Sequence, residues 1–331
     1  FVFVSGYFYK VQNEEKPLQH IWYKFKKLMI PFFIINLVYG IIITVLKNQG
    51  IIYFGEGINL FTLFVQPFIN NNQFVFNFPA WFVPTLFLTY TTFFLMNKLF
   101  RRLIKSEPKR DILLFIITLI FQIVSTFMQD LTYKNEYIVI ILRIIFFMPF
   151  LEFGHIYKKN LQKYDDKIPS VPYLIILMGF NYIIYKIFGD LNYDMHEFSG
   201  FKGVQFLVPT ITSFVAILVY TRIARILSKK LGSSKIVNYI SNNTFGIMMH
   251  HIFVTFVIGF ILYVVNACIV SVPNFDVELF KKGWVYIYSV PNIQVLIELI
   301  YVIVGIAVPI LIHCIYEKIK AKVKVKINHN S

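Results

Sequence analysis

Nine apolar stretches run along this chain, and the loops between them alternate between segments crowded with lysine and arginine and segments that carry few. Because these residues resist translocation and stay in the cytoplasm, the alternation predicts a multi-pass protein of the cell membrane whose basic loops are cytoplasmic. Most of the 32 basic residues fall in five clusters, at Lys10–Lys27, Lys98–Arg110, Lys158–Lys167, Arg222–Lys235 and Lys318–Lys326. The segments with few basic residues are 47–80, 130–136, 189–203 and 268–291.

Composition supports the membrane interpretation and argues against nucleic acid as a partner. The chain is 57% hydrophobic and 18% aromatic, and 15% of its residues are charged, whereas a soluble domain carries about a quarter. A net charge of +15 would suit nucleic acid, but its confinement to alternate loops indicates membrane topology and attraction to anionic lipid.

Span lengths predict an all-α polytopic transmembrane bundle. About 20 residues cross the hydrocarbon core as a helix, and Phe1–Tyr9 is too short to do so. We expect about nine spans, the first partial, and about ten in the intact protein, because this stub descends toward the cytoplasmic Lys10–Lys27 loop. The chain is then one membrane-embedded domain over 1–331 that lacks its first helix, with a basic cytoplasmic tail at 318–331. The eight full spans are expected at 28–46, 81–98, 112–129, 137–157, 171–188, 204–227, 244–267 and 292–316.

The remaining loops and the cysteines add smaller expectations. The longest connection, 47–80, is predicted to be external, with a re-entrant or interfacial helix at 54–68 and a turn at 70–73. Cys268 and Cys314 lie near opposite membrane faces, so a disulfide between them is not expected. The chain offers too few soft ligands for a metal site.

His250 and His251 are the first candidates for chemistry, because polar groups inside a span are costly and often functional. They lie about 10 Å along their helix from its cytoplasmic end, and neighbouring side chains point about 100° apart. Only one imidazole can therefore face a given cavity, where it could act as a general base toward a hydroxyl. Alternatively, the pair bonds to neighbouring groups and holds helices together.

Arg143, Glu152 and His155 form a second intramembrane polar group. Glu152 and His155 are three residues apart and share a helix face, whereas Arg143 is half a turn out of phase with Glu152 and is not expected to pair with it. The alternative is structural: an interhelical ion pair for Arg143 and headgroup-level placement for His155.

Lys24, Lys26 and Lys27 precede the span that opens at Leu28, and Trp81 enters the membrane from the opposite side. The lysines are either positive-inside anchors or a cytoplasmic site for the phosphates of a coenzyme A thioester. Trp81 is typical of an interfacial anchor.

Taken together, these segments resemble the acyltransferase-3 family, integral-membrane O-acyltransferases that modify cell-surface glycans and lipids. The resemblance covers nearly the whole chain and rests on the order and spacing of short, mostly apolar blocks. These blocks are FVFVSGYFY at the start, KFKKLMIPFF at 24–33, AWFVPTLF at 80–87, RIIFFMPFLEFGHIYKK at 143–159 and SNNTFGIMMHHIFV at 241–254.

The resemblance implies roles for particular residues. Ser5 and Gly6 match the family's Ser-Gly-aromatic motif, and Lys24 and Lys27 match a basic pair that is normally arginine, so the arginine fork is lost. Thr244 and His251 match a late helix, where His250 is an addition, and Glu152 is unusual for the middle helix. The family keeps its most important histidine on a first helix absent from these residues. If that histidine is the base, His250 and His251 are supporting residues and this fragment is inactive.

The function expected is transfer of an acyl group, with acetyl favoured, from a cytoplasmic acyl-CoA co-substrate to a hydroxyl of a cell-surface glycan or lipid-linked saccharide. No cofactor is expected to stay bound. A double displacement through an acyl-enzyme stays open. The main rival is a transporter or flippase for polysaccharide precursors, with His250, His251, Arg143 and Glu152 along its path. A second rival is a polysaccharide polymerase, but segment 47–80 carries few charges for such a role.

Overall fold

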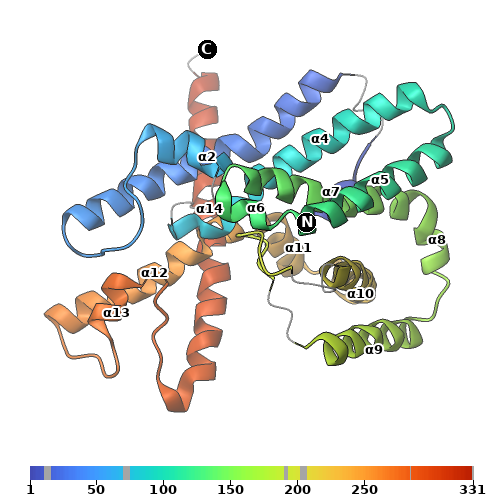
Figure 1. Cartoon of the computed structure of the whole chain (residues 1–331). Coiled ribbons are helices and arrows are strands. Elements are labelled where there is room, and N and C mark those ends of the chain that lie inside the picture. The colour runs from blue at the N-terminus through green and yellow to red at the C-terminus, as the bar shows by residue number, and fades with distance from the viewer. Residues whose placement is uncertain (11–15, 70–74, 190–192, 202–206, 284, 330–331) are drawn as a thin grey trace. The chain divides into compact units, whose positions relative to one another are not determined.

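The structure is a computed structural model that describes residues 1–10, 16–69, 75–189, 193–201, 207–283 and 285–329. Within these residues it is helical and has no strands (Figure 1). Eight helices in the described part of the chain are long and apolar enough to cross a membrane. They confirm the predicted all-α polytopic architecture and indicate a multi-pass membrane protein. The eight spans are Pro17–Asn48, Phe76–Leu103, Glu107–Phe127, Ile138–Asp165, Ser170–Phe188, Val208–Leu231, Thr244–Cys268 and Pro291–Ile315.

Each of the eight predicted full spans has its counterpart, and the segment 1–9 contains a short helix, α1 (Val2–Tyr7). The predicted interfacial helix at 54–68 corresponds in part to a π-helical turn, Phe61–Val65, followed by α3 (Gln66–Ile69). The predicted turn at 70–73 lies outside the described residues. The tail expected to be basic and cytoplasmic continues α14 (Gln294–His329) as helix.

The chain divides into two compact units. The first unit contains Phe1–Pro31, Gln66–Asn71 and Trp81–Lys230. The second unit contains Phe32–Val65, Asn72–Ala80 and Leu231–Ser331. The interpretation of residues 1–331 as one membrane-embedded domain stays a prediction.

In the first unit, α7 (Ile138–Ile156) is the central helix. It packs against α1, α4 (Phe82–Leu103) and α5 (Glu107–Phe127). Figure 1 shows α4, α5 and α7 side by side. Twelve of the 19 residues of α7 are buried, as expected for a helix that is apolar on every side.

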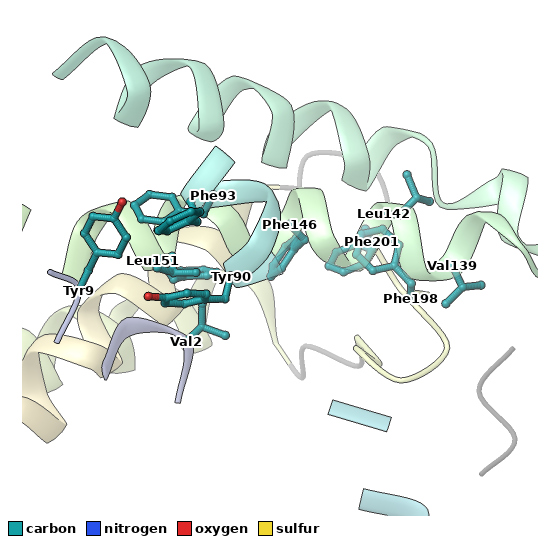
Figure 2. Close-up of a cluster of buried hydrophobic side chains, with 12 residues drawn as sticks. Val2, Tyr9, Tyr90, Phe93, Val139, Leu142, Phe146, Leu151, Phe198 and Phe201 are labelled. Carbon is teal, nitrogen blue, oxygen red and sulfur yellow. The ribbon is translucent and has the colours of Figure 1, made fainter. Parts of the chain in front are cut away.

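Aromatic side chains form most of the core around α7. In Figure 2, Tyr9, Tyr90 and Phe93 gather near Leu151, and Phe198 and Phe201 lie near Phe146 and Leu142 of the same helix. The aromatic rings contact one another tilted or edge-on, for example Tyr9 with Phe93 at 5.3 Å between centroids. Such contacts add to the stabilisation from buried area.

Ser5 and Gly6 of the predicted Ser-Gly-aromatic motif lie in α1, and Gly6 explains why that motif needs a small residue. A Cβ added at Gly6 would overlap the carbonyl oxygen of Leu151, and one added at Gly154 would overlap that of Phe3. Because both residues are glycine, α1 and α7 approach backbone to backbone.

Ion pairs gather at one end of the first unit, and hydrogen bonds from side chains to loop backbone lie at the other end. At the charged end, Lys159 pairs with Asp111 and Arg222 pairs with Asp165. At the opposite end of α5 and α7, Gln129 bonds to the backbone of Phe201, and Arg143 bonds to that of Met195. The loops predicted on opposite membrane sides therefore lie at opposite ends of this unit. Which end faces the cytoplasm stays a prediction.

The second unit is built on the later part of α2 (Pro17–Asn48) together with α12 (Thr244–Cys268), α13 (Val277–Lys282) and α14. Its core is again aromatic, and the ring of Phe76 lies tilted against that of Phe256 with centroids 4.4 Å apart. The backbone N–H of Tyr53 donates to the carbonyl of Lys281 at 2.8 Å. A buried pair, Asn77 to Asn36 at 2.7 Å, supplies a polar contact inside the unit.

Candidate functional site

His251 lies on α12 with one ring nitrogen committed to the backbone. Its Nδ1 is 3.0 Å from the carbonyl oxygens of Ile247 and Met248, one turn earlier in the same helix. A carbonyl can only accept, so Nδ1 carries the proton and donates. In the neutral ring, Nε2 then keeps its lone pair. This tautomer is the one that a general base requires.

A cavity of 440 Å³ lies beside His251 between α12 and α14. Most of its wall is apolar, and the hydroxyl-bearing residues in it are Thr244, Thr255 and Tyr301. Thr244 begins α12, and its hydroxyl donates to the Ser241 carbonyl at 2.8 Å. A small group carrying a hydroxyl could therefore approach His251 in a largely apolar setting.

His250 takes a different position, as expected for adjacent residues on a helix. Its Nδ1 lies 2.5 Å from the hydroxyl of Tyr39 on α2, and the two rings meet edge to face. Tyr39 is buried and belongs to the aromatic core of the second unit. His250 thus joins α2 to α12, which is the structural role considered for the histidine pair.

In the first unit, Glu152 and His155 are both buried on the inner face of α7. Asn97 approaches Glu152 from α4, and Asp111 of α5 contributes to the electrostatic environment of both. Among the described residues, neither carboxylate oxygen of Glu152 nor Nδ1 of His155 completes a hydrogen bond. The ring of His155 lies 5.3 Å from that of Tyr9. His155 is therefore buried inside the unit, and its placement at headgroup level stays a prediction.

A network of ion pairs around Asp111 lies beside Glu152 and His155. Lys159 Nζ lies 2.6 Å from Asp111 Oδ2 and 2.7 Å from Glu107 Oε1. Arg110 Nη2 lies 3.3 Å from Asp111 Oδ1. Because Asp111 is 1% exposed, its charge depends on these two cations.

The three lysines predicted to bind the donor lie on the first turns of α2, in the first unit. The Nζ of Lys24 lies 4.5 Å from the centroid of the Tyr90 ring, whose hydroxyl bonds to His20 Nε2 at 2.9 Å. Lys26 lies over Trp22, and both Lys26 and Lys27 are exposed. Their ammonium groups are accessible to a phosphate.

Arg143 and Trp81 meet at the other end of the first unit. The guanidinium carbon of Arg143 lies 4.4 Å from the Trp81 ring centroid, and Arg143 Nε donates to the Met195 carbonyl at 2.9 Å. Arg143 does not contact Glu152, as the helical phase predicted. Trp81 therefore holds a buried arginine by a cation–π contact.

Asp194, His196 and Glu197 are the one group of possible metal ligands found among the described residues, with ligand atoms within 4.8 Å of one another. Asp194 Oδ1 already accepts the backbone N–H groups of His196 and Glu197, at 2.6 and 3.3 Å. These contacts are those of a turn closed by an aspartate side chain.

Several residues in these clusters were missed from the sequence. Asn97, Asp111 and Tyr39 are single polar residues within apolar spans. A polar residue in such a position is a candidate for function, and this is how the sequence could have indicated them. Asp165 and Arg222 lie in or beside basic clusters of the sequence, and an excess of positive charge does not indicate which carboxylate pairs with which cation.

The sequence matches the model of the Acyltransferase domain family, acyltransferase-3, over residues 1–314. This chain belongs to the acyltransferase-3 family. No curated protein and no solved structure matches it significantly. Membership confirms the resemblance drawn from the sequence blocks and supports acyl transfer as the general activity of this acyltransferase-3 protein.

Proposed function

We propose that this protein transfers an acyl group, preferentially acetyl, from acyl-CoA to a hydroxyl of a cell-surface glycan or lipid-linked saccharide. Family membership supports acyl transfer in general. The observation that carries the catalytic assignment is the geometry of His251. Its Nδ1–H is bound to two carbonyls at 3.0 Å, and the residue lines a 440 Å³ cavity.

In this proposal, His251 Nε2 removes the proton of the acceptor hydroxyl as the oxygen attacks the thioester carbonyl. The new C–O bond forms, the C–S bond breaks, and the imidazolium returns the proton to the departing thiolate. The backbone carbonyls that accept from Nδ1 stabilise the ring while it carries positive charge.

Donor phosphates are proposed to bind Lys24 and Lys27, with Lys26 assisting. The support is the exposure of Lys26 and Lys27 and the position of Lys24 over an aromatic ring. Lysine offers compact charge without the paired donors of arginine, so it recognises phosphate mainly by charge.

The two adjacent histidines provide the test and its matched control. Membranes carrying His251→Gln, His250→Gln or the unchanged chain would be given labelled acetyl-CoA and candidate saccharides. We expect His251→Gln to lower kcat by about 10² to 10⁴, the usual contribution of a general base, and His250→Gln to keep most of it. Equal activity of His251→Gln and the unchanged chain would remove His251 from the mechanism.

A transporter for polysaccharide precursors is the alternative that one observation favours. Buried polar atoms of Glu152, Asn97 and His155 that complete no hydrogen bond within the described residues would suit a path for a polar substrate. A transporter consumes no thioester, so release of free coenzyme A that depends on the saccharide distinguishes the two functions.

A further inference from the structure

A polar cavity of 290 Å³ lies in the first unit between the start of α9 (Ser170–Phe188) and the last turns of α10 (Val208–Leu231). Its walls carry four basic side chains, Lys167, Arg222, Arg225 and Lys229, and one carboxylate, Asp166. None of these residues is assigned to acyl transfer.

The arginines of this cavity are fixed by a buried aspartate. Arg222 Nη2 lies 2.9 Å from Asp165 Oδ1, and Arg225 Nη1 lies 2.8 Å from Asp165 Oδ2. Arg222 Nη1 also donates to the Ile168 carbonyl at 2.6 Å. Because these contacts restrict the guanidinium groups, the cavity is organised before any ligand arrives.

Positive charge remains after these contacts are made. Arg222 is 4% exposed, and its Nε has no hydrogen-bond partner among the described residues. Lys229 forms no ion pair with any residue that the structure describes. One carboxylate in the wall and Asp165 behind it do not balance four cations, so the cavity favours an anion.

The start of α9 adds to this preference. No side chain caps its N-terminus, which follows Pro169, and Ser170 lines the cavity. Uncapped N–H groups at the positive end of a 19-residue helix attract phosphate.

The size of the cavity and its neighbours indicate where the phosphate comes from. At 290 Å³ it is at the lower end of the range for small-molecule sites, about 300 to 1,000 Å³, and is too small for a whole nucleotide thioester. Within α9, all of whose residues are described, Ile184 is the single buried side chain. The other aliphatic side chains of this helix are therefore exposed or only partly covered. A lipid beside α9 could lay its acyl chains on these side chains.

We propose that this cavity binds the phosphate of an anionic phospholipid headgroup, held by Arg222, Lys229 and Lys167 at the start of α9. Free phosphate and the phosphates of coenzyme A share this chemistry and are the competing sources. The site is independent of the acyl-transfer assignment.

The test measures binding to the purified full chain in a neutral detergent, with thermal unfolding and native mass spectrometry as readouts. The ligands are phosphatidylglycerol, phosphatidylcholine, inorganic phosphate and coenzyme A. The variant Lys167→Gln/Lys229→Gln leaves the Asp165 contacts intact, and Lys186→Gln/Lys281→Gln is the control with the same change of charge away from the cavity.

We expect phosphatidylglycerol to raise the unfolding temperature and remain bound, and the cavity variant to bind it at least about tenfold more weakly, since each lysine near an anionic headgroup contributes to affinity. The control variant should bind like the unchanged chain. Equal affinity of the cavity variant and the unchanged chain would overturn the proposal. So would a response to coenzyme A or inorganic phosphate with none to phosphatidylglycerol, because the phosphate would then come from a soluble ligand. Neither readout depends on acyl transfer.

Discussion

Gly6 of α1 and Gly154 of α7 bring two backbones into direct contact, and neither position has room for a Cβ. This contact fixes the short first helix against the central helix that carries Glu152 and His155. A small residue at each position is therefore a packing requirement rather than a preference of the turn or helix.

Gly154→Ala should lower the free energy of unfolding by about 1 to 3 kcal/mol or more, because an added methyl group must displace backbone atoms. Gly179→Ala in α9 is the matched control, since nothing lies within 4 Å of its added Cβ and alanine favours helix. Denaturation in detergent compares them. Equal loss of stability in both variants would contradict the packing argument.

Tyr39→Phe should destabilise the protein by about 1 to 3 kcal/mol, because it removes the hydroxyl that bonds to His250 and leaves Nδ1 of that half-buried ring unpaired. Its kcat for acyl transfer should change far less than that of His251→Gln. Thermal unfolding and turnover of the same preparations check both statements. A large fall in kcat at unchanged stability would give the Tyr39–His250 pair a part in the chemistry.

Much of the fold could be predicted from the sequence, because crossing a membrane requires long apolar helices. The span predicted at 137–157 is α7, Ile138–Ile156. Its continuation to Asp165 was missed because Lys158, Lys159 and Lys163 resemble a basic loop. Pairing of Lys159 with Asp111 joins residues far apart in sequence, and hydropathy carries no information about it.

The candidate site was predictable only in part. Helical phase separated His250 from His251 and Arg143 from Glu152, and the structure agrees. Helical phase could not indicate that Nδ1 of His251 bonds to the Ile247 carbonyl of the same helix, since that contact depends on the side-chain rotamer. Nor could it pair Arg143 with Trp81, because this contact joins separate spans.

Replacing Lys24 and Lys27 by Gln should raise the KM for acyl-CoA with little change in kcat, since two positive charges near the donor phosphates are lost. The corresponding Arg variants keep the charge and change its shape, so they should retain most of the affinity. Steady-state kinetics over a range of acyl-CoA concentrations measure both. An unchanged KM in the Gln variant would exclude these lysines from donor binding.

Lys159→Met should be strongly destabilising, by about 3 to 5 kcal/mol, because it removes the closest cation from the buried carboxylate of Asp111. Lys158→Met is the control, since Lys158 bonds to the Tyr7 hydroxyl at 3.1 Å and leaves no carboxylate unpaired. Expression level and thermal unfolding compare the neighbours. Similar behaviour of the two variants would show that Asp111 does not depend on Lys159.

The central claim is that this membrane protein transfers an acyl group from a thioester offered at its basic face. The most direct measurement supplies labelled acetyl-CoA to sealed vesicles of both orientations, each carrying either the unchanged chain or His251→Gln, with a saccharide acceptor present. We predict labelled saccharide and free coenzyme A when the basic loops face the added thioester, and about 10² to 10⁴ times less of both with His251→Gln. Movement of saccharide across the membrane without any thioester cleavage would contradict the account.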